Sequence, residues 1–507
     1  MTNITRVGVI LALVALPWGI SGEIDGVKWR AGAAWADDDD GDDDDDGPTR
    51  TPRPPRVPAA PRTPPPAARP PVVRAPVVRA PVVQAPAVRA PVVQAPVVQA
   101  PVVQAPAVQA PTRRVQAPVP PAPVRQAPPP PTRAPDEIVA LDLDDADLAT
   151  LLARGFAVIE ERSIARLDVI SRRLQIPQGI PLEEARDLVR ALDSGGDADF
   201  NHYYRSEQGA PDPEPRAPVC DGLHCASLSQ ISWPVEIARG SACDRDIAIG
   251  MIDTGLNPDH ETFEDAQLEL HRLTEDALDP SRAIHGTAVA ALLIGDHDSR
   301  SPGLMPDARL VALDVFHRDA SDERADVFTL VDGLGFLADA DVRVINLSLA
   351  GPANTVLEET INRLVAENGI VIVAAAGNGG PSAEPAYPAA YHQVIAVTAV
   401  DQSGAVYRRA GRGPHIEFAA PGVEVWTAAS ISGARAKTGT SFAAPFVAAA
   451  AALILQDDPT LTPEGVRLRL AATARDLGEA GRDDTYGFGL ISLEGVCDAR
   501  LSPAAPR

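Results

Sequence analysis

The chain has 507 residues, 51 of them proline, and a formal net charge of −24 at pH 7. Most of the prolines precede residue 136, so a packed core has to form from the residues after them, which suffice for one large and one small domain. Residues 48–135 contain arginines and no aspartate or glutamate. Because the whole chain is nonetheless strongly negative, the part that folds has to be strongly acidic. Such a surface is repelled by nucleic acid and by anionic membranes, so we expect no nucleic-acid partner.

Residues 1–36 have the pattern of an export signal. A weakly basic start is followed by the apolar run Val7 to Ile20, which is short for a bilayer span, and then by the small-x-small sequence Ala34-Trp35-Ala36. A cut after Gly22 and an uncleaved membrane anchor are the alternatives. We expect a secreted protein, extracellular or periplasmic, with tethering to the cell surface or membrane as the other arrangement.

Residues 37–135 predict a disordered, proline-rich stalk. An acidic run from Asp37 to Asp46 opens it, and from Pro71 to Pro111 a proline recurs every five residues. Proline at this density blocks helix and sheet and favours extended polyproline II. Two interpretations remain open: a spacer that holds the folded part away from a surface, or a tail without a specific partner.

Residues 136–205 predict a small α+β domain, and residues 206–219 a linker rich in proline and charge. The apolar spacing gives the order β-α-β-β-α-β, which suggests a ferredoxin-like fold. The predicted elements are a strand at Glu137–Leu143, a helix at Ala146–Gly155, strands at Ala157–Ile159 and Leu167–Ile170, a helix at Pro181–Leu192 and a strand at Asp199–Tyr204.

Residues 220–500 predict a larger α/β domain, because buried strands alternate with helices as in a parallel sheet covered on its faces. The predicted elements are strands at Ile247–Asp253, Arg309–Val315, Val342–Ser348 and Ile370–Ala376, and helices at His285–Ile294, Val356–Asn368 and Phe446–Leu455.

Four cysteines fit an exported protein, and they allow three pairings. Cys220 and Cys225 are close enough for a local loop, which would leave Cys243 to pair with Cys497. The alternative is buried free thiols. No Cys-x-x-Cys occurs, so the sequence does not support a zinc site or a redox motif.

Two motifs place an acid and a base where sites form in parallel sheets. Asp253-Thr254-Gly255 follows a buried strand, at the carboxyl edge where such sheets bind ligands. His285 begins an apolar helix, whose dipole disfavours imidazolium and helps keep a base neutral near pH 7. Each motif alone is weak, since Asp-Thr-Gly also marks aspartic proteases and a lone histidine is more often a surface residue.

A third motif supplies a nucleophile at a helix start. In Gly439-Thr440-Ser441, the glycine permits a sharp turn, and Ser441 lies where unpaired backbone N–H groups can face a developing oxyanion. Pro445 lies in the first turn of the helix, where its missing N–H costs little.

With these motifs the chain resembles the subtilisin-like serine proteases (peptidase S8, the subtilase family) over about residues 228–495. The order is Asp, His, Ser, and the spacings between Asp253, His285, Asn378 and Ser441 are 32, 93 and 63 residues. Further resemblance lies in Ile345–Leu349, Ala374–Asn378, Tyr387–Ala389 and Ala420–Gly422. The implied fold is α/β, a parallel sheet flanked by helices, preceded by a small ferredoxin-like propeptide domain.

The resemblance implies a serine-type endopeptidase in which Ser441 is the nucleophile, His285 the general base, Asp253 the residue that orients His285, and Asn378 an oxyanion donor. It also implies substrate-binding walls that are small and uncharged, so the pocket before the scissile bond should accept apolar or aromatic side chains. These walls are Ser348, Leu349, Ala350, Gly351, Ala375, Ala376 and Gly377. Ala350 replaces a glycine common in the family, which leaves the shape of this pocket open.

Partners and cofactors follow from the same resemblance. We expect polypeptide substrates, a monomer, and inhibition by the chain's own propeptide, residues 136–205, whose last strand carries Tyr203 and Tyr204 to dock in an apolar groove. Cleavage by the enzyme itself is expected between Tyr204 and Val219. No cofactor is required: the stretch from Gly295 to Pro306 is short for the family's calcium loop, and its Asp296 and Asp298 do not support a calcium site. The rival function is a binding or scaffold module, inactive or cutting only itself, displayed on the stalk.

Overall fold

The computed structural model describes residues 21–24, 27–30, 129–206, 226–234, 243 and 246–497. The chain divides into two units, residues 1–116 and 117–507. In the first unit, β1 (Ser21–Ile24) and β2 (Val27–Arg30) form an antiparallel hairpin inside the predicted signal region. The apolar run Val7 to Ile20, the stalk up to residue 128 and the linker after Ser206 lie outside the described residues.

The small domain, residues 129–206, has the predicted ferredoxin-like topology. Its antiparallel sheet has the strand order β4-β5-β3-β6, and Ile138, Leu151 and Val189 are fully buried in its core. The prediction placed the third strand too early, because residues 165–167 form a 3-10 turn before it. The elements are β3 (Arg133–Leu141), α1 (Asp145–Ala153), β4 (Ala157–Ile164), η1 (Ala165–Leu167), β5 (Val169–Gln175), α2 (Leu182–Arg190) and β6 (Asp199–Ser206).

The large domain, residues 226–497 as described, is built on a seven-stranded parallel sheet, as predicted. The strand order is β17-β16-β15-β13-β7-β10-β8, and every pair is parallel. The strands are β7 (Ala248–Asp253), β8 (Leu268–Arg272), β10 (Arg309–Asp314), β13 (Val344–Leu347), β15 (Val371–Ala375), β16 (Ile395–Val400) and β17 (Ile416–Pro421).

Helices cover both faces of this sheet. On one face lie α4 (His285–Ile294), α7 (Ala444–Asp457) and α8 (Pro463–Thr473), and on the other α5 (Val327–Asp339) and α6 (Thr355–Asn368). Residues Thr440–Asp457 are the one stretch among the described helices that is long and apolar enough to cross a membrane, but 94% of it is buried inside the domain. It is therefore the core helix of the large domain, and the short helical elements of this domain are α3 (Ala226–Gln230), η2 (Glu261–Phe263) and η3 (Thr440–Phe442).

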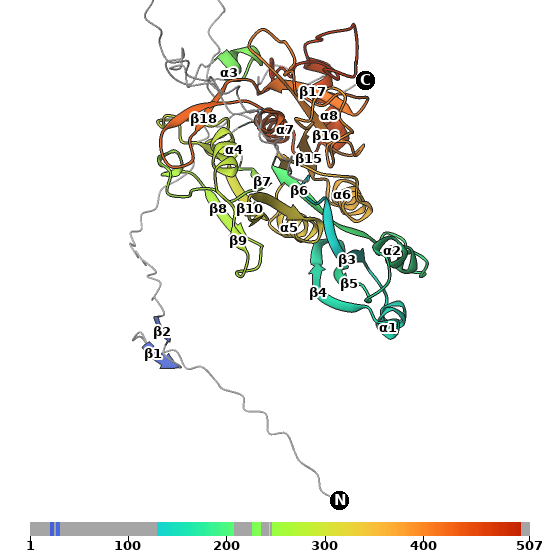
Figure 1. Cartoon of the computed structure of the whole chain (residues 1–507). Coiled ribbons are helices and arrows are strands. Elements are labelled where there is room, and N and C mark those ends of the chain that lie inside the picture. Colours follow the sequence, from blue (N-terminus) through green and yellow to red (C-terminus); the bar gives the residue numbers. More distant parts are fainter. Residues whose placement is uncertain are drawn as a thin grey trace, which may run out of the picture. The chain divides into compact units, whose positions relative to one another are not determined.

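The sheet of the small domain continues into the large domain. Figure 1 shows β6 running from the small domain toward the carboxyl edge of the large sheet. There β6 pairs with β12 (Asp322–Asp326) on one side and with the short β14 (Leu349–Ala350) on the other. The continuous strand order is β4-β5-β3-β6-β12-β11-β9, with β11 (His317–Asp319) and β9 (Asp279–Pro280) at the far end.

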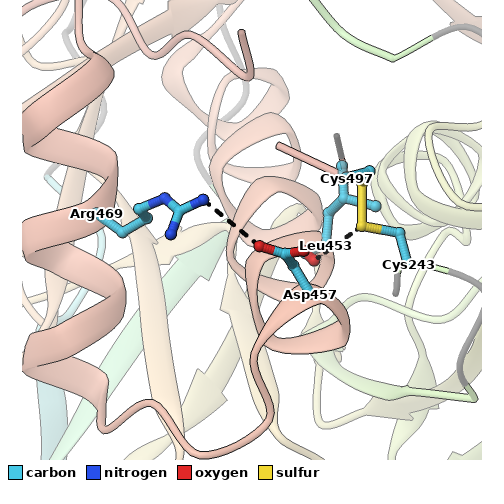
Figure 2. Close-up of a disulfide and its surroundings, with 5 residues drawn as sticks. All are labelled: Cys243, Leu453, Asp457, Arg469 and Cys497. Atoms are coloured by element: carbon cyan, nitrogen blue, oxygen red, sulfur yellow. Dashed lines mark hydrogen bonds and ion pairs between the residues drawn. A yellow bond between two sulfur atoms is a disulfide. The ribbon is translucent and has the colours of Figure 1, made fainter. Parts of the chain in front are cut away.

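A disulfide joins Cys243 to Cys497, which confirms that predicted pairing. Figure 2 shows the bond beside α7, where the Cys243 sulfur lies 3.8 Å from the Leu453 carbonyl oxygen. On the other side of α7, Arg469 of α8 pairs with Asp457 at 3.4 Å. The bond fixes the segment before β7 to the end of the domain, across 254 residues of sequence. Cys220 and Cys225 lie outside the described residues.

Candidate active site

Asp253 and His285 meet at the carboxyl edge of the large sheet. Asp253 is the last residue of β7 and His285 the first of α4, and both side chains are buried. His285 Nδ1 lies 2.7 Å from Asp253 Oδ1, which also accepts a hydrogen bond from the Thr254 amide at 2.7 Å. The carboxylate therefore fixes the ring and favours the tautomer that carries its proton on Nδ1. His285 Nε2 is buried and has no hydrogen-bond partner among the described residues.

The start of α4 is held against the end of β7. The Gly286 amide donates to Thr254 Oγ1 at 2.9 Å. A Cβ added at Gly286 would lie 2.3 Å from the Thr254 carbonyl oxygen, which is backbone and cannot move aside cheaply. Only glycine lets the helix approach this closely, and the approach is what sets His285 beside Asp253.

Ser441 lies in η3 (Thr440–Phe442), the single turn that leads into α7. Gly439 before it has φ +155° and ψ 160°, a region that essentially only glycine adopts. Ser441 is fully buried, and the ring of its neighbour Phe442 packs against the His285 imidazole with 5.5 Å between centroids. The turn thus brings Ser441 to the same edge as Asp253 and His285.

The Ser441 side chain contacts the end of the β13 segment. Its Oγ donates to the Ser348 carbonyl at 3.3 Å, and Ser348 Oγ donates to the Ser441 carbonyl at 2.9 Å. Asn346 Nδ2 supports this exchange by donating to Ser348 Oγ at 3.0 Å. Two segments 93 residues apart are therefore cross-linked at the nucleophile.

Asn378 follows β15, and Thr440, the residue before Ser441, fixes the orientation of its side-chain amide. Its Oδ1 accepts from the Thr440 amide at 3.1 Å and from Thr440 Oγ1 at 3.2 Å. Because the oxygen of the amide is held by Thr440, the Nδ2 donor lies on the other side of the same group. Thr440 also ties in Gly377, whose amide donates to Thr440 Oγ1 at 3.2 Å.

The predicted substrate-binding residues divide into two groups. Ser348 contacts Ser441, Leu349 and Ala350 pair with β6, and Gly351 packs on the Tyr204 ring. The second group, Ala375 to Gly377, runs from the end of β15 to Asn378 and is joined to the Ser441 turn through Gly377.

The Tyr204 side chain of β6 packs into the core of the large domain. It is fully buried, and its hydroxyl donates to the Pro352 carbonyl at 2.8 Å. A Cβ added at Gly351 would lie 2.4 Å from the Tyr204 ring, so the ring rests directly on that backbone. The expected docking of Tyr203 is wrong: alternate residues of a strand face opposite sides, and its half-buried ring stacks instead under the Arg324 guanidinium at 4.1 Å.

Strand β12, which flanks β6 on the side away from β14, was not predicted from the sequence. Ala325 and Asp326 pair with Tyr204 and Tyr203, and Asp322 binds Arg205. The segment 317–326 is rich in charge and lacks an alternating apolar pattern, so it gives no strand signal. Its position directly before the cap of α5 is the one local clue, since the Asp326 side chain accepts from the Thr329 amide at 3.0 Å.

A second carboxylate lies beside the first. Asp314 ends β10 and is in register with Asp253 of β7. Burial raises the pKa of Asp314 to about 6, against hydrogen bonds from the Phe316 amide and Ser281 that lower it. Ser281 Oγ also accepts from the Gly255 amide at 2.7 Å, so Asp314 supports the turn that follows Asp253.

The described residues hold no group of three or more histidine, cysteine, aspartate or glutamate side chains arranged to bind a metal ion. In the stretch whose sequence does not support a calcium site, Asp296 Oδ1 accepts a hydrogen bond from the Asp298 amide at 2.8 Å. The two residues thus form a local turn.

Hydrolases with a serine nucleophile use a histidine held by a buried carboxylate together with a serine at a helix start, and this site has those three residues. Comparison with known proteins narrows the class. Residues 244–489 match the Subtilase family, peptidase S8. Subtilisin DY of Bacillus licheniformis is 35% identical over 253 residues, which are 49% of this chain and 89% of the relative. A subtilisin of Bacillus pumilus is 31% identical over 271 residues, 53% of this chain and 96% of the relative.

The fold agrees with a solved structure of fervidolysin from Fervidobacterium pennivorans, a keratinolytic enzyme related to subtilisin. The TM-score is 0.60 at 22% identity, covering 72% of this chain and 61% of that one, which shows the likeness of fold alone. The subtilase match and the identity to the subtilisins place the chain in the subtilase family: this protein is a serine endopeptidase that acts on polypeptides.

Proposed function

We propose that this protein is an exported, self-maturing subtilisin-like endopeptidase, in which the small domain is the propeptide and β6 occupies the substrate groove before maturation. The observation that carries the proposal is the position of β6. It lies between β12 and β14, antiparallel to both, and β14 begins directly after Ser348, whose carbonyl accepts from Ser441 Oγ. A strand threaded this way leads its own chain toward the nucleophile.

The reaction assigns each residue a role. Ser441 Oγ attacks the scissile carbonyl carbon and passes its proton to His285 Nε2, while Asp253 stabilises the imidazolium through Nδ1. The Asn378 amide and the Ser441 backbone N–H donate to the oxyanion. The C–N bond then breaks, Nε2 returns the proton to the leaving amine, and water hydrolyses the acyl ester to free Ser441.

The resting geometry supports this order of events. Ser441 Oγ donates to Ser348 at 3.3 Å, a long hydrogen bond, whereas the buried His285 Nε2 lacks a partner among the described residues. Unpaired buried polar atoms are costly, so rotation of the serine hydroxyl toward Nε2 would give the imidazole the hydrogen bond that it lacks. We expect that rotation when a scissile bond enters the groove.

Export is part of the proposal. The Cys243–Cys497 disulfide fits an oxidising compartment, which is where a signal peptide would deliver the chain. Maturation would remove residues up to the cut between Tyr204 and Val219, and both cysteines of the disulfide would remain in the enzyme. Because β6 extends to Ser206, we expect the cut at the beginning of that window.

The test expresses wild type and Ser441→Ala side by side in a host without other exported proteases. We expect the wild type to be shortened within the window and Ser441→Ala to stay uncut, as read by mass spectrometry and N-terminal sequencing. Processing of both chains at the same site and rate would show that another protease makes the cut.

The same samples separate the endopeptidase from a scaffold that cuts only itself. A fluorophosphonate probe should label Ser441 in processed wild type and leave Ser441→Ala unlabelled. Processed wild type from which the cut small domain has been removed should also digest an added unfolded protein, and such a sample that leaves the protein intact would favour the scaffold.

A further inference from the structure

Arg205 of β6 makes a two-pronged contact with the wall of the groove. Its Nε and Nη2 donate to the two carboxylate oxygens of Asp322, each at 2.8 Å. The side chains are only 28% and 18% exposed. Such a planar pair is geometrically demanding, because both donors and both acceptors have to be aligned at once.

Asp322 is positioned by the large domain itself. Arg324 Nη1 donates to Asp322 Oδ2 at 3.0 Å, and Arg324 Nη2 to Asp319 Oδ2 at 2.8 Å. Two carboxylates facing one guanidinium leave this cluster with a net negative charge once β6 is removed. The hydrogen bond from Arg205, followed by that from Arg324, holds the pKa of Asp322 below its ordinary value.

We propose that Asp322 also determines substrate specificity. It selects an arginine in a bound substrate at the position equivalent to Arg205, directly after the residue that takes the place of Tyr204. This inference rests on the proposed function, since it takes β6 as the pattern for a substrate strand. A substrate arginine would find both carboxylate oxygens already oriented by Arg324. Lysine, a point charge, would satisfy one of them and bind less well.

One contact of Arg205 belongs to the small domain alone. Its Nη2 also donates to the Pro131 carbonyl at 2.7 Å, which a substrate peptide lacks. The selectivity toward peptides therefore rests on Asp322. For a partly exposed pair of this kind we expect about a two- to fivefold preference in kcat/KM, and added salt should reduce it.

The experiment uses the enzyme after the full chain has processed itself and the cut small domain has left it, as shown by digestion of casein. Three peptides carry the sequence of residues 201–212 with arginine, citrulline or glutamate at the position of Arg205; citrulline keeps the shape of arginine and removes its charge. Enzymes are wild type, Asp322→Asn, Asp322→Lys and the control Glu323→Gln. Glu323 precedes Arg324 on the same strand, but its carboxylate accepts from the Arg282 amide at 2.6 Å. Hydrolysis of casein is measured in parallel.

We expect wild type and Glu323→Gln to prefer the arginine peptide over citrulline by the stated factor, Asp322→Asn to treat them alike, and Asp322→Lys to prefer glutamate. Wild type that digests casein but cuts the arginine and citrulline peptides equally, or cuts neither, would overturn the inference and leave the proposed function standing. Wild type that digests neither casein nor peptide would overturn both. The wild-type comparison stands even where a variant fails to fold.

Discussion

Tyr204 anchors the small domain, and removing its ring should release β6 from the groove. The ring is fully buried on Gly351, and its hydroxyl donates to Pro352. Truncating a buried aromatic ring costs about 3–5 kcal/mol. Tyr203, on the same strand, is half-buried and makes one cation–π contact, worth about 0.5–1 kcal/mol. The pair is a matched comparison of adjacent tyrosines that face opposite sides.

The assay is hydrogen exchange in the uncut Ser441→Ala chain, followed in fragments that contain residues 203–206 and 349–351. If undocking limits exchange, a loss of 3–5 kcal/mol in docking free energy lowers protection about 100- to 1000-fold or more in Tyr204→Ala. The smaller loss in Tyr203→Ala lowers protection less than about tenfold. Gly351→Ala should act from the other side, because its Cβ would clash with the ring. In the Tyr204→Ala background that same change should have little further effect. Equal losses for the two tyrosine variants would refute the assignment of Tyr204 as the anchor.

Three further predictions concern the oxyanion donor, pH and the disulfide. Asn378→Leu should keep the fold and cut turnover about 100- to 1000-fold in peptide assays, the size known for such a donor in subtilisin rather than one worked from this structure; a change of a few-fold would mean another group holds the oxyanion. His202 touches Asn354 at 2.9 Å, and its burial lowers its pKa to about 4. Since this lies below the pKa of a free histidine, docking should weaken as the pH falls from about 6.5 to 4, in exchange corrected for intrinsic rates, and a pH-independent result would count against it. Replacing Cys243 and Cys497 by serine should lower the free energy of unfolding by about 2–5 kcal/mol in denaturant titrations, and an unchanged midpoint would contradict that.

The sequence predicted the parts of the fold that carry a periodic or a chemical signal. Helix His285–Ile294 has the predicted bounds because an apolar helix follows a motif with a defined start. The first strand of the small domain begins at Arg133, four residues before the prediction, because Ala134 and Pro135 resemble the stalk in composition. Strand β4 continues to Ile164 through charged residues whose side chains are mostly exposed, so its second half carries no alternating pattern.

Strand β12 could not be predicted locally, because its conformation depends on two neighbours. Residues 322–326 have a charged sequence without an alternating apolar pattern, yet they pair with β11 and with β6 of another domain. Backbone pairing with these partners, rather than a local apolar pattern, makes it a strand. The Asp322–Arg205 contact follows from that pairing, across 117 residues of sequence, and was therefore also beyond reach.

The way β6 is bound implies that cutting the chain is not sufficient to activate the enzyme. The first half of β6, from Asp199 to His202, is already extended by its pairing with β3, so docking of the strand avoids part of the ordering cost of about 1–2 kcal/mol per residue that a free peptide meets. A single cut after Ser206 leaves Tyr204, Arg205 and both strand pairings in place. The cut small domain should therefore still outcompete substrates, and activity should appear only as it leaves or is digested. Changes that loosen this strand, such as truncation of Tyr204 or protonation of His202, should thus increase the rate at which activity appears.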